Sequence, residues 1–399
     1  MNDHTIGPTG FIGASMAVQG ITDATVVLHG QTGCRKGLLG SQNVMPRTEV
    51  RDPSFYGGGT AIPYSNIRPE DYYSDTSSKL GAVMDHVCSE DYALRVLMCS
   101  PGISIVGDDC DRYTAGEGTM VLDTDRLSDR GCVGFDQSIR EILEGLHPEK
   151  GETVEGGVNI LGLSIMHKDW YSFRHELAHF LKDAGLKVVC PVGAGCTVDE
   201  LRRSVNASCN IVVDPAYSAI TSRFYSERYG IPSVSIGRCP IGFDATEEFM
   251  HAVGDAVGTP LSHGLSMVRK AKRRAYGSIT ASGKSLVGKT FDIVAEETTC
   301  APLGDFLRDS FGMVEDSDRP DYLFAPGDIA LLEQRSGNCW KGVDIGFPSS
   351  STFDFLKKPL MGIEGTMYVL DSLFNRRACR ILRRGASSPG CAPGGCPCP

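Results

Sequence analysis

Two cysteines stand where the sequence favours thiol chemistry. Cys34 follows an apolar run that ends in His29 and Gly30, and Cys99 ends the apolar run of residues 93–98. In α/β proteins, a buried strand that ends in glycines and leads into a helix is a common way to build a site. Unpaired backbone N–H groups at the start of that helix favour the thiolate, which binds metals and attacks electrophiles. The alternative for Cys34 is a small buried cysteine beside a tight turn.

The elements that position these cysteines follow an α/β pattern. Apolar runs of strand length alternate with amphipathic segments of helical length, and this spacing predicts parallel sheets with crossover helices, as in Rossmann-like domains. Strands are predicted at 25–29, 93–98, 120–122, 158–163, 186–190, 210–213, 233–236, 291–295, 322–324 and 343–346. Helices are predicted at 10–19, 73–87, 135–146, 170–184, 197–204, 217–229, 246–257, 267–276, 303–311 and 365–375.

The chain divides into domains at a charged, glycine-rich segment over residues 147–157. We predict an N-terminal α/β domain (1–150), a Rossmann-like domain (151–262) and a short C-terminal α/β domain (263–376). The last part of the chain, 377–399, has no hydrophobic face and is predicted to be a disordered, cysteine-rich tail.

Composition excludes several classes of protein. With 41% hydrophobic and 22% charged residues, the 399-residue chain has the composition of a soluble globular protein. A formal net charge of −10 argues against a nucleic-acid partner. No apolar run reaches the roughly 18 residues of a membrane span, so no membrane partner is expected. The N-terminus lacks the basic start and apolar core of a signal peptide, so we expect a cytoplasmic protein.

Fifteen cysteines are an unusual number for a cytoplasmic chain. A disulfide framework is not expected in a reducing compartment, and the count is odd. Iron–sulfur ligation, an anaerobic host that does not select against thiols, or both explain the number better, and most of these cysteines are expected to be plain buried residues. Cys391, Cys396 and Cys398 could bind a soft metal or be incidental.

Five stretches of the chain carry a family likeness. They are TGFIGASMAVQGITDATVVLHGQTGC (9–34), CSPGISIVGDD (99–109), GCVGFDQSIREIL (131–143), YGIPSVSIGRCPIGFDATEEF (229–249) and DIGFPSSSTFDFLKKPLMGIEGTMYVLDSL (344–373). In this order and spacing they resemble nitrogenase component 1. That superfamily includes nitrogenase catalytic and cofactor-scaffold subunits, dark-operative chlorophyll-pathway reductases and the Ni-sirohydrochlorin a,c-diamide reductive cyclase. The resemblance implies an α/β fold with three Rossmann-like parallel domains around a central cleft.

In this family, cysteines at the positions of Cys34 and Cys99 hold an iron–sulfur cluster at a subunit interface. Ser100 and Gly102 could donate hydrogen bonds to its sulfurs and tune its potential. The family usually has a further cysteine where this chain has Thr9. One chain therefore offers two thiolates, whereas a 4Fe–4S cluster takes four. The resemblance thus implies a cluster shared between two chains.

The sequence leaves two alternatives for the partner chain that completes the cluster. A homodimer could supply Cys34 and Cys99 from both chains across a two-fold axis, and a heterodimer with a related component 1 subunit is the alternative. Cys88 or Cys110 could be a third ligand, although neither lies in a matching motif. In the family, a separate iron–sulfur reductase hydrolyses ATP. No nucleotide is expected on this chain, because residues 283–289 (GKSLVGK) lack the strand and helix of a phosphate loop.

The position of the cysteine that holds the large nitrogenase cofactor is occupied here by Asp214. A carboxylate is a poor replacement for thiolate on iron sulfide, and no histidine stands in the GFPSSS stretch, so dinitrogen reduction is not expected. Asp214 is either an acid that faces substrate or a helix N-cap before Pro215. We expect the substrate in a cleft lined by residues 57–63, by the turn 167–170 with His167, and by Asp214.

A further histidine pair has metal-ligand spacing. His175 and His179 are four residues apart, which places two imidazoles on one helix face. Glu176 lies between them, so residues 175–179 (HELAH) have the order H-E-x-x-H. We nevertheless expect a solvated or packing role for the pair and not a metal site.

These observations favour the catalytic component of an ATP-dependent two-component reductase. It would take low-potential electrons from an iron-protein-like reductase. A tetrapyrrole is the favoured substrate, because low-potential electrons reduce its conjugated ring without a complex metal cofactor. Reduction of a small sulfur or carbon compound on a simpler cluster is an open alternative for the substrate. The alternatives for the role are a scaffold that assembles and transfers a complex iron–sulfur cofactor, and a regulatory relative that binds no cluster.

Overall fold

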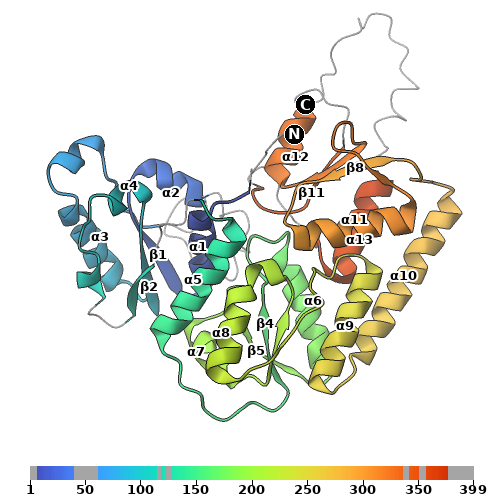
Figure 1. Cartoon of the computed structure of the whole chain (residues 1–399), viewed down its shortest axis with the longest axis horizontal. Helices are drawn as coiled ribbons and strands as arrows, with labels where there is room; N and C mark the ends of the chain where they lie inside the picture. The colour runs from blue at the N-terminus through green and yellow to red at the C-terminus, as the bar shows by residue number, and fades with distance from the viewer. Residues whose placement is uncertain are drawn as a thin grey trace, which may run out of the picture.

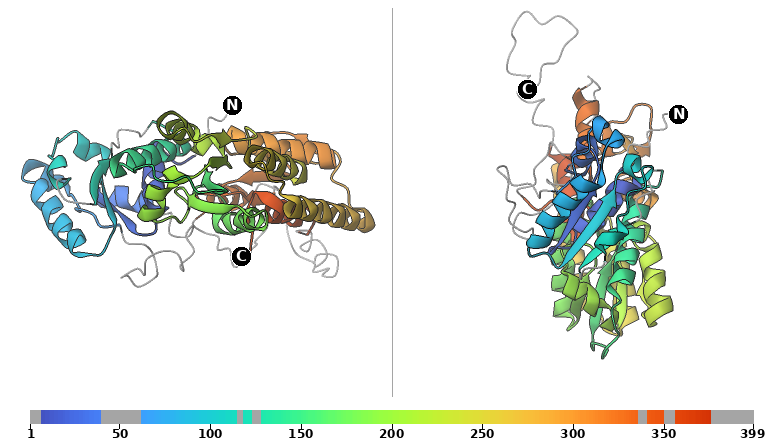
Figure 2. Two further views of the ribbon diagram at one scale, coloured as in Figure 1. Left: turned by 90° about the horizontal axis from the view of Figure 1, so that it is seen from below. Right: turned by 90° about the vertical axis from the view of Figure 1, so that its left-hand side faces the viewer.

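Three parallel sheets form the framework of the protein. The computed structural model describes residues 7–39, 62–114, 118–122, 128–335, 341–349 and 356–375. In Figure 1 the N-terminal sheet lies in the blue part, the middle sheet in the green part, and the C-terminal sheet in the orange part. Figure 2 shows from two further directions that the three parts adjoin one another. This α/β architecture confirms the predicted fold class.

The N-terminal sheet has the order β1-β2-β3, and all its strands are parallel. Its register places His29 beside Cys99, so the first two strands end at the same level. The strands are β1 (Ala24–His29), β2 (Leu94–Cys99) and β3 (Thr119–Leu122). The helices are α1 (Gly10–Gln19), α2 (Thr32–Leu39), α3 (Ser77–Ser89), α4 (Pro101–Ser104) and α5 (Gly131–Leu146).

The middle sheet has the order β5-β4-β6-β7, so the chain first moves to one side of β4 and then to the other. With right-handed crossovers this change of direction puts helices on both faces and opens a crevice between the carboxyl ends of β4 and β6. The strands are β4 (Gly157–Leu161), β5 (Lys187–Pro191), β6 (Cys209–Val212) and β7 (Ser233–Val234). The helices are α6 (Trp170–Asp183), α7 (Val198–Arg203), α8 (Ala219–Tyr229) and α9 (Phe243–Val257).

The C-terminal sheet repeats this plan with the order β11-β10-β8-β9. A long helix, α10 (Ser262–Ser282), leads into it from the middle part (Figure 1). The strands are β8 (Thr290–Ile293), β9 (Val314–Glu315), β10 (Tyr322–Ala325) and β11 (Lys341–Asp344). The helices are α11 (Glu297–Phe311), α12 (Gly327–Arg335) and α13 (Gly362–Phe374).

A single hydrophobic cluster joins the three sheets. It contains Val26 of β1, Ile160 of β4 and Phe324 of β10, all fully buried. Burial of apolar area stabilises a protein by roughly 25 cal/mol per Å², so the shared core opposes independent movement of the parts. No helix among the described residues is long and apolar enough to cross a membrane.

Helices α1 and α5 cross with their backbones in direct contact. A Cβ atom at Gly13 would lie 1.9 Å from the carbonyl oxygen of Gly131, and one at Gly134 would lie 2.1 Å from that of Gly10. Real Cβ atoms do not approach backbone so closely, so only glycine permits this crossing. The contact holds the start of α1 beside the loop that precedes α5.

Replacing Gly13 by alanine is expected to destabilise the protein by about 3 kcal/mol, because the new methyl group meets rigid backbone. The matched control is Gly277→Ala on the exposed face of α10, where a Cβ atom meets nothing within 4 Å. That substitution should stabilise the helix by up to about 1 kcal/mol. Urea unfolding of both variants measures the difference, and equal unfolding midpoints would contradict the close contact.

Glu176 of α6 connects the middle part to the C-terminal part. Its carboxylate accepts hydrogen bonds from the backbone N–H groups of Ile363 (2.8 Å) and Glu364 (3.1 Å) at the start of α13. Burial raises the pKa of Glu176 from 4.5 to about 7, although these two hydrogen bonds act in the opposite direction. The residue between the two histidines of the sequence pattern is thus a tether between helices.

This raised pKa predicts a pH-dependent stability. Because the folded protein binds the proton more tightly than the unfolded chain, the contribution is fully present below about pH 4.5 and is lost as pH rises through 7. The loss amounts to up to about 3 kcal/mol. Glu176→Gln should remove this slope between pH 5 and pH 8 in urea unfolding. An unchanged slope would show that Glu176 titrates normally.

Three elements were missed from the sequence. The helices α4 and α12 and the two-residue strand β9 were not predicted, and α10 extends well beyond the basic segment 267–276 on both sides. Residues 57–61 of the expected cleft loop and the predicted tail at 377–399 lie outside the described residues.

Candidate functional site

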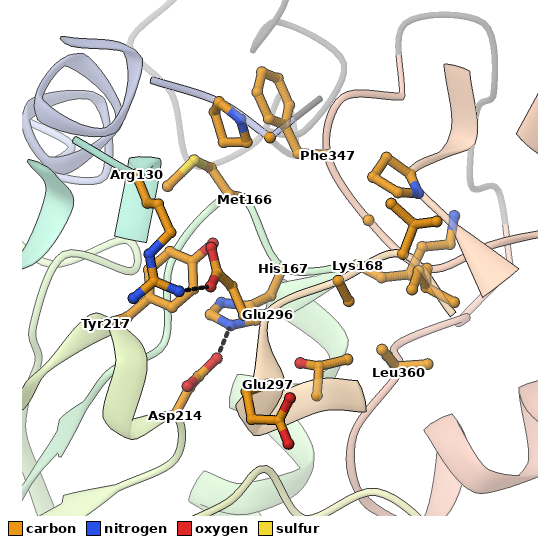
Figure 3. Close-up of a pocket in the computed structure, with 18 of the residues that line it drawn as sticks. Arg130, Met166, His167, Lys168, Asp214, Tyr217, Glu296, Glu297, Phe347 and Leu360 are labelled. Carbon is orange, nitrogen blue, oxygen red and sulfur yellow. Dashed lines mark hydrogen bonds and ion pairs between the residues drawn. The ribbon is translucent and has the colours of Figure 1, made fainter. Parts of the chain in front are cut away.

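A cavity of about 670 Å³ lies where the three parts of the chain meet. It receives loops that follow β3, β4 and β6, and loops that follow β8, β10 and β11 (Figure 3). This volume is within the range of about 300–1,000 Å³ that is usual for small-molecule sites. The cavity therefore has the size and the position of a substrate site.

The two acid–base residues expected from the sequence both line this cavity. His167 lies on the loop after β4, and Asp214 follows β6 directly. These are the two strands between which the order of the middle sheet reverses, so the crevice of the fold brings the two side chains together. The end of the predicted cleft loop differs from expectation, because Ile62 and Pro63 lie against α2 and β1 and do not line the cavity. Trp170, at the end of the predicted turn, does not line it either.

The imidazole of His167 is held on both nitrogens. Its Nδ1 lies 2.9 Å from the backbone nitrogen of Ser164, whose N–H it accepts, and 3.2 Å from the carbonyl oxygen of the same residue. Nε2 lies 3.1 Å from Oδ2 of Asp214 and donates to it (Figure 3). The ring also lies over Tyr217, with 4.6 Å between ring centroids. The imidazole ring is therefore held in one orientation.

Asp214 is the helix N-cap that the sequence offered as one alternative, and it also lies in the cavity wall. Its Oδ1 accepts the backbone N–H of Ala216 at 2.9 Å and so caps the short helix Pro215–Tyr217, while Oδ2 accepts from His167. Burial alone would raise the pKa of Asp214. The hydrogen bonds from His167 and Ala216 outweigh that effect and hold the pKa below its usual value. The side chain is thus a buried carboxylate.

A second pair of charged residues lies in the cavity wall. Arg130, before α5, forms a 2.5 Å ion pair with Glu296, which precedes α11 (Figure 3). The thiol of Cys132 donates to the same carboxylate at 3.4 Å, and burial together with Glu296 raises the pKa of Cys132 to about 12. Sequence patterns missed Arg130 and Glu296 because charged residues in loops carry no local signal. The contact between them is formed by the fold.

A buried ion pair joins the middle and C-terminal parts beside the cavity. Nζ of Lys168 lies 2.7 Å from Oδ2 of Asp344, at the end of β11. The same oxygen accepts from the hydroxyl of Ser349, and Oδ1 accepts from the backbone N–H of Gly346. The pair therefore fixes the loop after β11 against the loop after β4.

The described residues that line the cavity include no cysteine. Thr9, which occupies the position of a family cysteine, lies here at the N-terminal end of α1. The described donors in the wall are mainly oxygen and imidazole groups. Such a wall suits an organic substrate better than a large metal sulfide, which requires soft ligands.

The candidate cluster ligands lie at the carboxyl edge of the N-terminal sheet. Cys34 is in the first turn of α2, which follows β1, and Cys99 ends β2. Both cysteines are half-buried. The structure adds a third thiol that the sequence only offered as an alternative, since Sγ of Cys110 lies 3.2 Å from Sγ of Cys99. Cys88, the other alternative, is exposed on α3.

A set of buried hydrogen bonds holds the loop that leads to Cys110. The buried imidazole of His29 contacts Ser65 through Nδ1 and Asp108 through Nε2, each at 2.8 Å. Asp108 also accepts from the hydroxyl of Thr76 at 2.5 Å. Because His29 is the strand neighbour of Cys99, these bonds hold the loop with Asp108 against the thiols. Burial is the main reason that the pKa of His29 is lowered.

One hydrogen bond joins the two thiols and shifts their pKa values in opposite directions. Together with burial it raises the pKa of Cys99, and it lowers the pKa of Cys110. Both residues line a separate cavity of about 250 Å³, together with Ser104, Asp108 and Asp109. Space for a bound group is therefore present directly beside the sulfurs.

Ser100 and Gly102 lie close to the same edge. Ser100 is buried and its backbone N–H donates to the carbonyl of His29 at 2.8 Å. A Cβ atom at Gly30 would lie 2.6 Å from the hydroxyl oxygen of Ser100, so the turn after β1 requires glycine. Gly102 is in α4, next to the hydroxyl of Tyr72. That they donate to a cluster sulfur remains a prediction.

The two histidines of α6, His175 and His179, have different surroundings. The ring of His175 packs against Tyr171, with 4.3 Å between centroids. Ligand atoms of His179, Asp183 and His263 lie within 4.8 Å of one another on the exposed surfaces of α6 and α10. This trio is solvated and distant in sequence from the cysteines.

The donor set of the N-terminal edge fits an iron–sulfur group. Thiolates are the ligands of such clusters, and Cys99 and Cys110 lie together beside open space at this sheet edge, while Cys34 lies in the first turn of α2, after the neighbouring strand. Among the described residues, three thiols lie at this edge, those of Cys34, Cys99 and Cys110. The central cavity does not offer such a set among its described residues.

Together these features define a class of protein. Three parallel α/β units enclose a cavity, and thiols stand at the carboxyl edge of the first unit, as in nitrogenase-type oxidoreductases. Comparison with known families agrees, since residues 9–314 match the family model "Nitrogenase component 1 type Oxidoreductase". The chain belongs to the nitrogenase component 1 type oxidoreductase family.

Curated relatives come from two branches of this family. The chain is similar to the nitrogenase iron-molybdenum cofactor biosynthesis protein NifE of Clostridium pasteurianum, with 21% identity over 66% of this chain and 55% of the relative. It is also similar to one component of the light-independent protochlorophyllide reductase of Prosthecochloris aestuarii, with 23% identity over 76% of this chain and 59% of the relative. The chain thus spans little more than half the length of either protein.

Solved structures show the same fold. The structure "Nitrogenase Cp1 at pH 6.5" superimposes with a TM-score of 0.71 over 96% of this chain and 94% of that chain, at 15% identity. A second structure, "Nitrogenase Cp1 at pH 5", gives a TM-score of 0.68 over 96% of this chain and 90% of that chain, at 12% identity.

Proposed function

We propose that this chain is the catalytic component of a nitrogenase-like, ATP-dependent two-component reductase. Its substrate would lie in the central cavity, and a tetrapyrrole is the favoured class. The observation that carries the proposal is the His167–Asp214 pair in the cavity wall, in the same chain as the thiols of the N-terminal sheet. A reductase needs both a source of electrons and a source of protons.

The chain's own residues would do the following. Cys34 and Cys99 hold an iron–sulfur cluster, of the 4Fe–4S type that the sequence resemblance implies, shared with a second chain. When bound, this cluster supplies low-potential electrons one at a time. As the imidazolium, His167 would hold a proton at Nε2, facing Asp214, and one at Nδ1, facing the carbonyl oxygen of Ser164, and it would give one of them to the substrate and become neutral. The carboxylate of Asp214 would stabilise this charged form. Reduction of one double bond consumes two electrons and two protons.

The surface near Cys99 supports a second chain as partner. Tyr73 is 94% exposed and Ile105 is 89% exposed, and such large apolar side chains usually mark an interaction surface when they gather. The segments that carry them touch, since the hydroxyl of Tyr72 lies 3.1 Å from a Cβ position at Gly102. A homodimer or a heterodimer with a related subunit would cover this surface and complete the cluster. An iron-protein-like reductase would be the electron donor.

Analysis of anaerobically purified protein tests the proposal. We expect about four irons per two chains, an EPR signal of a reduced iron–sulfur cluster, and ATP-dependent turnover with an iron-protein-like reductase. Absorbance titration with protochlorophyllide tests the substrate class, and a shifted Soret band would indicate binding. Purified protein that contains no iron would contradict the proposed reductase function.

A scaffold for a complex iron–sulfur cofactor is the second candidate. The similarity to a cofactor biosynthesis protein favours it. A scaffold would release its metal to a client without consuming substrate, and it would carry metal beyond the shared cluster. The lack of cysteine among the described cavity residues argues against this candidate.

A further inference from the structure

Three side chains with metal-binding atoms meet on the surface where α6 passes the start of α10. They are His179 and Asp183 of α6 and His263 of α10, and their ligand atoms all lie within 4.8 Å of one another. We propose that this trio binds a divalent transition-metal ion such as Zn²⁺. None of the three residues lines the central cavity or the cavity beside Cys99, so the site is independent of the proposed function.

The distances between the ligand atoms are close to those of a tetrahedral zinc site. Nε2 of His179 lies 3.5 Å from Oδ2 of Asp183, and Nε2 of His263 lies 3.7 Å from the same oxygen. Nitrogen and oxygen ligands of a tetrahedral zinc ion, each about 2.0–2.1 Å from the metal, are roughly 3.4 Å apart. Both pairs are therefore nearly at the required separation. The two imidazoles have to approach each other further, which rotation of exposed rings about χ2 allows.

The donor set determines the kind of metal. Two imidazole nitrogens and one carboxylate oxygen suit zinc and its transition-metal neighbours, whereas Mg²⁺ and Ca²⁺ prefer sites made of oxygen atoms alone. The side chains of His179, Asp183 and His263 are 65%, 33% and 56% exposed, so a metal ion can enter directly from solvent. Water would then occupy the fourth tetrahedral position.

The backbone on both sides of the site is held in place by packing. His179 and Asp183 are four residues apart on α6, which puts them on the same helix face. Phe180, the neighbour of His179, is buried. Gly264, the neighbour of His263, packs so closely that a Cβ atom there would lie 3.2 Å from the Phe180 ring. The two helices therefore touch directly beside the ligands, and this contact fixes the distance that a metal ion would span.

The H-E-x-x-H order of residues 175–179 does not itself form this site. The ring of His175 packs against Tyr171, and the carboxylate of Glu176 accepts hydrogen bonds from the start of α13. The third ligand comes instead from α10, the helix that leads into the C-terminal part. A metal ion would thus connect this helix to the middle part. Since unfolding separates the ligands, the ion would bind the folded chain preferentially and stabilise it.

Zinc titration of the full chain, purified without oxygen, tests the site by isothermal titration calorimetry. Cysteines of this chain can also bind zinc, so the measurement is the difference between wild-type protein and variants. His263→Ala and His179→Ala should each bind one Zn²⁺ fewer per chain, or bind it at least about tenfold more weakly, because a ligand is lost. The matched control is His251→Ala on α9. His251 is exposed and lies 3.9 Å from Glu247, but it belongs to no such trio among the described residues.

Unfolding midpoints with and without metal complete the test. Without metal, wild-type protein, His263→Ala and His251→Ala should unfold at similar midpoints, because both substitutions are on the surface. Zn²⁺ should raise the midpoint of wild-type protein and of His251→Ala more than that of His263→Ala, whereas Mg²⁺ should not distinguish them. Equal zinc binding by wild-type protein and His263→Ala would overturn the proposal, as would an equal rise of their midpoints. Neither result bears on the proposed reductase, which uses other residues.

Discussion

Cys99→Ala is expected to abolish the iron–sulfur cluster and to lower ATP-dependent reduction more than about 100-fold. Loss of a group that merely supports a metal ligand typically costs 10- to 100-fold, so loss of the ligand itself costs at least as much. The position of Cys99 at the end of β2, beside open space and a second thiol, is the structural reason. Iron, sulfide and turnover measured on the same anaerobic sample give the result.

The same experiment distinguishes ligation from folding. Cys88→Ala changes an exposed thiol on α3 and should leave iron content and turnover at the wild-type level. Cys34→Ala should behave like Cys99→Ala, because both thiols lie at one sheet edge. Full activity of Cys99→Ala would contradict the electron path that we propose through this edge.

His167→Ala is the substitution with the second-largest expected effect. Removal of a positioned proton donor typically lowers the rate by a factor of about 10² to 10⁴. Turnover should fall within that range while the iron content stays unchanged, since His167 lines the central cavity and not the cavity at Cys99. The KM for substrate should change little, because the loss concerns the reaction step.

Asp214→Asn refines this prediction. Asparagine can still accept from the backbone N–H of Ala216 and cap the short helix, so folding should be preserved. It cannot stabilise an imidazolium at His167 as a carboxylate does. Turnover should therefore fall at least about tenfold, within the range for acid–base groups. The surface variant His251→Ala is the control, and equal rates for all three variants would exclude a proton-transfer role.

Much of the fold could be predicted from the sequence, because the patterns that indicate strands and helices are local. Apolar runs such as residues 158–163 alternate with helical segments, and this pattern predicts parallel sheets whatever the loops do. It could not reveal α12 or the two-residue strand β9, whose short segments lack a clear period. Side-chain pairs between distant segments were equally hidden.

The candidate site, like the fold, could be predicted only in part from the sequence. Cys34 and Cys99 stand at strand ends that motif and hydrophobicity identify, and Asp214 was visible as a position where a carboxylate replaces a thiol. The contact of Cys110 with Cys99 depends on a hydrogen bond from His29 to Asp108, 79 positions along the chain. No local pattern encodes such a bond. It arises only when β1 and the loop after β2 have assembled.

The buried ion pair between Lys168 and Asp344 has a consequence for how this protein can be divided or evolve. Replacing either residue alone would leave the other charge buried without its ion-pair partner, at a cost of several kcal/mol. An exchange of the C-terminal part between relatives that preserves stability therefore has to carry both charges together.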